Sequence, residues 1–99
     1  MKTLIENHLP NYSSKVLKVK INGEYVKFKI TCRSYNSGFE FDVYIQTKNM
    51  DWAKVAMQYD IPNIKSIKYI WSDIERIEVA RQNIALAEIY IKQVFVDNK

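Results

Sequence analysis

Residues 15–30, KVLKVKINGEYVKFKI, predict a tight β-hairpin, the strongest local signal in the sequence. Two runs in which apolar and polar side chains alternate are separated by Asn22-Gly23. This dipeptide favours the type I′ turn that joins two antiparallel strands, since both of its central residues need a positive φ angle. Pairing across the turn gives the hairpin one apolar face, and the pairs on that face are Leu17 with Phe28 and Val19 with Val26.

A third strand is predicted after a second turn at residues 34–38. In the run FEFDVYIQT, residues 39–47, large apolar side chains alternate with polar ones. This alternation is typical of a strand that buries one face and exposes the other. Because the three strands follow one another along the chain, they form an antiparallel meander with an apolar face and a polar face.

The polar face of this meander concentrates positive charge. Residues 15–33 hold six basic side chains against Glu24 alone, a local charge of +5 in a chain whose net charge is +4. Lysines interleaved with tyrosines are open to three interpretations: a solvated surface, a surface that contacts phosphate, or a protein-binding surface. The candidate partner-binding residues on this face are Lys18, Lys20, Tyr25, Lys27, Lys29, Arg33 and Tyr44.

The C-terminal part of the chain predicts one long helix. Ser72 and Glu75 form a capping box, which marks the start of a helix. No glycine or proline follows this box, so the helix extends to about Val96, a length of about 24 residues or roughly 36 Å. Its apolar side chains are too many for a three-stranded sheet to cover, and we therefore predict a homodimer, with packing of these residues in the core of one chain as the alternative. The residues of the predicted dimer face are Ile77, Ala80, Ile84, Ala87, Ile91 and Val94.

The segment between the meander and this helix predicts one or two short helices. Asn49 is a suitable N-cap for a helix over residues 50–59, and Pro62 ends that helix. Residues 63–71, NIKSIKYIW, fit either a second helix or a fourth strand.

Residues 50–71 also resemble a helix-turn-helix in outline. Ala56 is small where the two helices of that motif approach, and Lys65 and Lys68 would face the major groove of DNA as further candidate partner-binding residues. However, Asp60 occupies the turn position where the motif has glycine, and the spacing is longer than the standard one. Two packed connecting helices are the alternative interpretation.

The sequence carries no catalytic or metal-binding signature. His8 is the one histidine, and it has no Cys, Asp or second His at the spacing of metal ligands. Cys32 lies in an apolar strand pattern, which predicts a buried and unreactive thiol. Nucleophile elbows and phosphate-binding loops do not occur. We therefore predict that the protein is not an enzyme and binds no cofactor or metal.

Taken together, these patterns predict an α+β fold in a single domain, residues 1–99. The prediction is a three-stranded antiparallel β-meander packed on a long C-terminal α-helix, with one or two short helices between. Apolar runs are shorter than the about 18 residues of a membrane span, and the N-terminal segment does not resemble a signal peptide. We therefore expect a cytoplasmic protein that does not contact a membrane.

For function, these features favour a small non-enzymatic binding protein that acts by stoichiometric contact with a protein partner. Lys, Ile and Asn, whose codons are AT-rich, are abundant. This composition suggests a low-GC bacterium or one of its phages or plasmids. A mobile-element origin would fit an inhibitor or regulator of a host defence enzyme. The alternative is nucleic-acid binding through the basic hairpin face, with residues 50–71 as a second contact.

Overall fold

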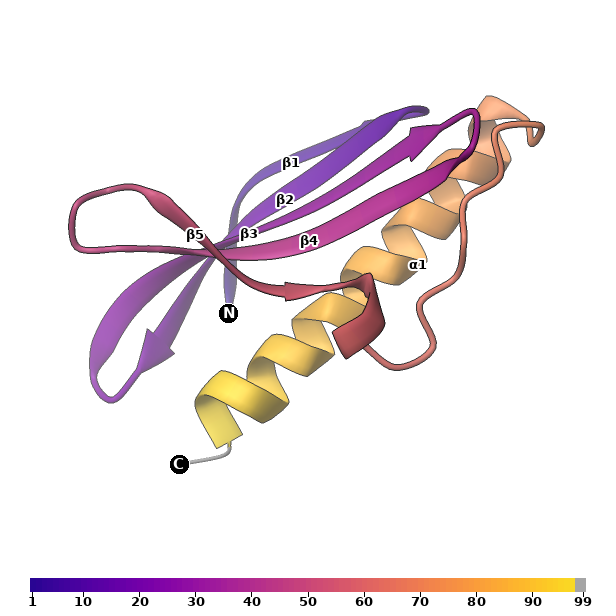
Figure 1. Ribbon diagram of the computed structural model, residues 1–99. Helices are drawn as coiled ribbons and strands as arrows, with labels where there is room; N and C mark the ends of the chain where they lie inside the picture. The colour runs from indigo at the N-terminus through magenta and orange to yellow at the C-terminus, as the bar shows by residue number, and fades with distance from the viewer. Residues whose placement is uncertain (98–99) are drawn as a thin grey trace.

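The computed structural model describes residues 1–97, and within them it contains five β-strands and a C-terminal α-helix (Figure 1). The strands form one antiparallel sheet in the order β1-β2-β3-β4-β5. The predicted α+β class is confirmed, but the prediction of three strands is wrong, because one further strand is added at each edge. The strands are β1 (Lys2–Leu9), β2 (Tyr12–Ile21), β3 (Glu24–Tyr35), β4 (Gly38–Gln46) and β5 (Trp52–Met57).

The central hairpin forms as the sequence predicts. β2 and β3 pair in the predicted register, with Leu17 opposite Phe28. Asn22 and Gly23 have φ angles of 51° and 82°, as a type I′ turn requires. β4 then pairs with β3 and completes the predicted meander.

β1 is an edge strand that the sequence does not reveal. Its residues are exposed except for His8, which is half-buried, so its apolar and polar side chains need not alternate. A bulge between Thr3 and Ile5 also shifts its register against β2, which breaks the two-residue period further.

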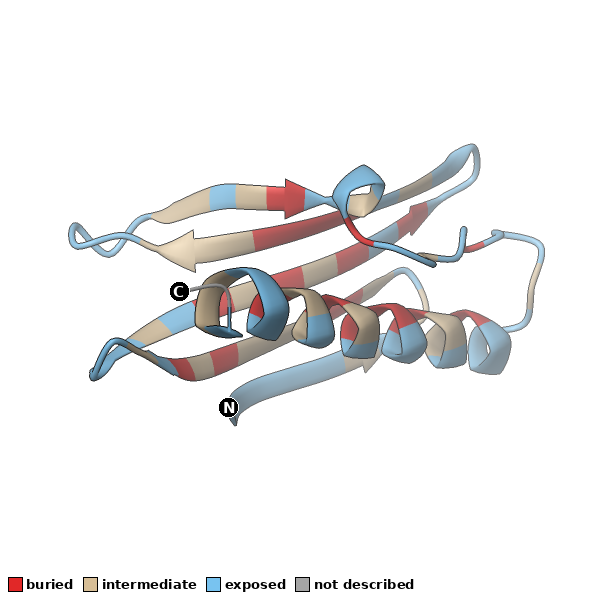
Figure 2. Ribbon diagram, turned by 90° about the horizontal axis from the view of Figure 1, so that it is seen from below, coloured by how far each residue is buried: buried red, intermediate tan, exposed pale blue. Residues whose placement is uncertain are grey.

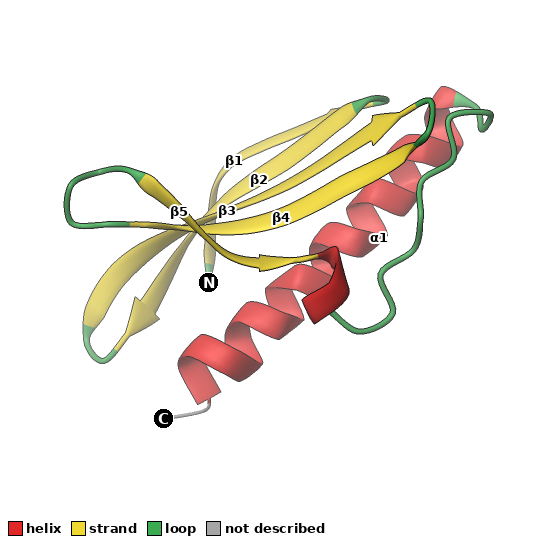
Figure 3. Cartoon of the chain, in the orientation of Figure 1, coloured by secondary structure: helices red, strands yellow, loops and turns green. Residues whose placement is uncertain are grey.

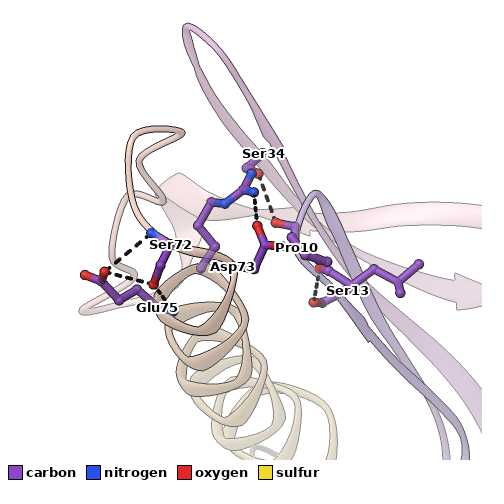
Figure 4. Close-up of polar contacts among 8 residues, drawn as sticks. Pro10, Ser13, Ser34, Ser72, Asp73 and Glu75 are labelled. Atoms are coloured by element: carbon purple, nitrogen blue, oxygen red, sulfur yellow. Dashed lines mark hydrogen bonds and ion pairs between the residues drawn. The ribbon is translucent and has the colours of Figure 1, made fainter.

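Short polar contacts hold the turn between β1 and β2 against the end of β3 (Figure 4). The Ser34 hydroxyl donates to the Pro10 carbonyl at 3.3 Å, and the Ser13 hydroxyl donates to the Leu9 carbonyl at 3.3 Å. The Ser34 backbone N–H donates to the Asn11 carbonyl at 3.1 Å. These contacts fix β1 to the sheet at this end.

The predicted helix over residues 50–59 is wrong. Trp52–Met57 pairs with β4 as β5, and a short 3-10 helix, η1 (Gln58–Asp60), follows it. Pairing with β4 satisfies the backbone and buries Ala56, and this tertiary context outweighs a weak local preference for helix. The described structure of residues 50–71 therefore contains no helix-turn-helix.

Residues 61–71 form neither a helix nor a strand, and they run beside the C-terminal helix as an irregular segment (Figure 3). Ile61 and Ile67 anchor this segment in the core. The fully buried Asn83 accepts a hydrogen bond from the Lys65 N–H at 3.0 Å and donates one to the Lys65 carbonyl at 2.7 Å. This side-chain amide supplies the backbone partners that a regular element would otherwise provide.

The C-terminal helix, α1 (Asp73–Ile91), begins at the predicted capping box (Figure 4). The Ser72 hydroxyl accepts from the Glu75 N–H at 3.3 Å, and the Glu75 carboxylate accepts from the Ser72 N–H at 3.4 Å. The α-helix ends before the predicted end near Val96, and the chain continues as a π-helical turn, η2 (Lys92–Asp97).

The predicted dimer face lies mostly inside the molecule. On α1, the side that faces the sheet is the buried side (Figure 2). Four of the six predicted residues are at most 4% exposed, namely Ala80, Ile84, Ala87 and Ile91. Ile77 is half-buried and Val94 is 39% exposed. α1 packs on β1, β2 and β3 of its own chain, and this packing covers most of the apolar residues on which the homodimer prediction depends.

Candidate functional site on the outer face of the sheet

α1 and residues 61–71 lie on one side of the sheet (Figure 1). We call the opposite side the outer face. Among residues 1–97, no helix or loop packs on it. Alternation along the strands brings side chains from all five strands to this face, and those side chains are what a partner would meet.

A row of three lysines crosses the outer face. Lys2 of β1 lies opposite Lys18 of β2, and Lys18 lies opposite Lys27 of β3. We call these residues the lysine row. Lys20 and Lys29 extend it along the strands, opposite Tyr25 and Tyr44 respectively. In the described residues, none of these five lysines forms an ion pair with a carboxylate.

The lysine row borders a hollow. The hollow is lined by Met1, Lys2, Lys18, Lys20 and Tyr25, and it has a volume of about 420 Å³. The Tyr25 side chain is 63% exposed. The Lys18 and Lys20 ammonium nitrogens lie 4.6 and 5.8 Å from the centroid of its ring, within the range of a cation–π contact. An exposed ring flanked by cations suits a ligand that carries both planar groups and negative charge.

Two further cation–aromatic groups lie along the outer face. In the middle, the Lys29 ammonium is 5.0 Å from the Tyr44 ring and 4.8 Å from the Trp52 ring. Burial raises the pKa of the Tyr44 phenol, with the neighbouring Asp42 carboxylate as a second cause. At the far end, the Arg33 guanidinium lies 5.3 Å from the Tyr12 ring.

The end of the outer face near Arg33 is balanced in charge, unlike the end with the lysine row. Glu40 lies opposite Arg33 in the register. Asp42 is buried and forms an ion pair with Lys54 at 3.2 Å. A hydrogen bond from Lys54 to this carboxylate raises the pKa of the Lys54 amine. The outer face therefore has one strongly positive end.

Seven of the nine candidate partner-binding residues gather on the outer face: Lys18, Lys20, Tyr25, Lys27, Lys29, Arg33 and Tyr44. The other two, Lys65 and Lys68, lie on the irregular segment. The Lys65 ammonium donates to the Gln82 side chain at 3.1 Å, and the Lys68 ammonium is 5.8 Å from the Trp71 ring. These two lysines do not extend the site.

The sequence prediction missed Lys2, Tyr12, Trp52 and Lys54. Lys2 lies on β1, and Trp52 and Lys54 lie on β5, the two edge strands without a clear alternating pattern. Tyr12 directly follows the β1–β2 turn. The signal that could have found it is the alternation of β2, which places residue 12 on the same face as Lys18.

The side chains that could act as a nucleophile or a general base, Cys32 and His8, lie away from the outer face. Burial raises the pKa of the Cys32 thiol to about 12, so its reactive thiolate is scarce near neutral pH. The His8 ring nitrogen Nε2 lies 2.6 Å from the Glu6 carboxylate, and this hydrogen bond lowers the pKa of Glu6. Across residues 1–97, no group of three or more His, Cys, Asp or Glu side chains is arranged to hold a metal ion.

None of the helices in the described part of the chain combines the length and the apolarity needed to cross a membrane. The comparisons with known proteins give no relative: no family model, curated protein or solved structure matches this chain.

Proposed function

We propose that this protein binds nucleic acid without catalysis, through the positive end of the outer face. The observation that carries the proposal is the lysine row, in which like charges lie directly opposite one another on three neighbouring strands. Such pairs destabilise a sheet. A phosphate placed above the row would remove this repulsion, so the arrangement is suited to an anionic ligand.

The distribution of the five lysines favours a polymer over a single phosphate. They come from three strands and are spread across the surface instead of converging on one point. A chain of phosphates can contact such amines in succession, and each contact releases counterions from the nucleic acid. The tyrosines among them add faces on which bases stack.

The test is the salt dependence of binding to a fluorescent oligonucleotide of about 20 nucleotides, longer than a typical single-strand site. With five phosphate contacts, log K should fall against log salt with a slope of about −3.5 for a single strand. Fluorescence anisotropy between roughly 50 and 200 mM salt measures this slope. Failure to bind at the lowest salt, or affinity that does not change with salt, contradicts the proposal.

A protein partner is the second candidate function, and a separate surface favours it. Tyr69 and Ile70 precede α1, and Ile74 lies in its first turn. Their side chains are 55%, 87% and 81% exposed. Exposed apolar side chains that cluster on a small protein often mark a protein interface. Stoichiometric contact with a host enzyme, as an inhibitor or regulator, would use this surface.

This second candidate is tested by co-purification of tagged variants from host cells. Ile70→Asp and Ile74→Asp should each lose a partner that the wild-type chain retains in stoichiometric amount. Ile89→Asp is the matched control, because Ile89 is 53% exposed on the same helix at a distance from the cluster. Retention of the partner by all three variants excludes this surface.

A further inference from the structure

We infer that the outer face is a track for single-stranded nucleic acid, with three aromatic positions that take bases along β3. This inference rests on the proposed function and goes further, because it specifies the form of the ligand, the length of the site and its direction. The three positions are Tyr25, the pair Tyr44 and Trp52, and Tyr12.

The spacing of the three positions along β3 supports one continuous track. Tyr25, Lys29 and Arg33 follow one another at intervals of four residues on the same face of this strand. At about 3.4 Å per residue, successive positions are roughly 14 Å apart, and the whole track is about 27 Å long. Each position combines at least one ring with a cation whose charged group lies within 6 Å of the ring centroid.

The pairing of rings with cations favours a single strand over a duplex. Aromatic side chains stack on base faces, and a single strand can turn individual bases out of its own stack onto them, which a duplex can do only by breaking base pairs. A cation beside each ring can meet the phosphate next to the stacked base. A duplex would offer its phosphates to the lysine row and leave the rings unused.

The two ends of the track should contribute in different ways. The end at Tyr25 has the unpaired lysines and should supply most of the electrostatic attraction. At the other end, Glu40 and Asp42 offset the charges of Arg33 and Lys54, so the ring of Tyr12 should contribute by stacking and add little to the salt dependence.

The length of the track predicts the length of the ligand. A stacked single strand advances about 3.4 Å per nucleotide, so a track of about 27 Å holds roughly eight nucleotides. Affinity for thymidine oligomers should therefore rise steeply between about four and eight nucleotides and then level off. The single-stranded oligomer should bind more tightly than a duplex of the same length.

Tyrosine variants separate stacking from charge. Tyr25→Leu should lower affinity roughly fivefold or more for oligomers of every length, given what one stacked base contributes. Tyr12→Leu should lower it for oligomers of about eight nucleotides but not for those of about four. Tyr12→Phe keeps the aromatic ring and should bind oligomers of about eight nucleotides with the affinity of the wild-type chain. Tyr59→Leu is the control, because Tyr59 is 84% exposed and follows β5 in η1.

The outcomes distinguish the track from the proposed function. Equal affinity for duplex and single strand, with affinity unchanged in Tyr25→Leu and Tyr12→Leu, overturns the track and leaves nucleic-acid binding intact. An affinity that levels off at about four nucleotides also overturns it, since a site that short ends before Tyr12. Failure of every oligomer to bind at low salt overturns both.

Discussion

Ile84→Glu is expected to unfold the chain and not to separate two copies of it. Ile84 is 2% exposed and lies on the side of α1 that packs on the sheet. A carboxylate at this position would lose its hydration without gaining a partner, which costs several kcal/mol. Domains of this size have a free energy of unfolding of about 5–15 kcal/mol. The substitution therefore removes most or all of the stability.

Circular dichroism during thermal and urea unfolding measures this effect. Ile89→Glu is the matched control, because the same change is made on the same helix at a residue that is 53% exposed. Its free energy of unfolding should change by roughly 0.5 kcal/mol or less. If Ile84→Glu instead gives a folded monomer with an unchanged melting temperature, Ile84 is not in the core, and the dimer face predicted from the sequence regains its basis.

Replacement of Lys18, Lys20, Lys27 and Lys29 by Gln should nearly abolish nucleic-acid binding. Four exposed charge contacts, each contributing about 0.5–1 kcal/mol, correspond to a loss of roughly 30-fold or more. The slope of log K against log salt should become shallower by about 2.8 for a single strand. Stability should not fall, because the substitutions also remove the repulsion between Lys18 and Lys27.

A matched control variant has the same change in net charge, made at lysines that lie outside the outer face. Replacement of Lys48, Lys65, Lys68 and Lys92 by Gln also removes four charges, so both variants go from a net charge of +4 to 0. These lysines lie in a turn, in the irregular segment and in η2, and affinity should change little. If both variants lose affinity equally, the attraction follows net charge and the outer face has no special role.

The parts of the fold that the sequence predicts correctly are those with strong local signals. Asn22-Gly23 determines the central hairpin because few other dipeptides adopt two positive φ angles. Ser72 and Glu75 locate the start of α1 to the residue, because a capping box satisfies specific backbone groups. Both signals depend on residues that are close in the sequence.

The edge strands could not be predicted in this way, because their conformation depends on their neighbours in the sheet. β1 is almost entirely exposed. Residues 52–57 have the composition of a short helix, and they become a strand because they pair with β4. Residues 61–71 owe their path to Asn83, which is 18 positions away from Lys65 in the sequence. Contacts of this kind leave no periodic pattern.

Residues of the candidate site could be predicted from the sequence only on the strands that could themselves be predicted. Alternation on β2 and β3 placed Lys18, Lys20, Tyr25, Lys27 and Lys29 on one face. The third member of the lysine row, Lys2, comes from β1, and the aromatic partner Trp52 comes from β5. The lysine row could not be recognised before β1 was placed beside β2.

The most direct test of nucleic-acid binding by the outer face is amide chemical-shift mapping by nuclear magnetic resonance. A thymidine oligomer of about eight nucleotides is added at low salt, matched to the predicted length of the track. We predict that the largest shift changes fall on the amides of β2 and β3 around Lys18, Lys20, Tyr25 and Lys27, and that residues 61–74 change little. Shift changes centred on residues 61–74, or no shift changes with excess oligomer, would contradict nucleic-acid binding by the outer face.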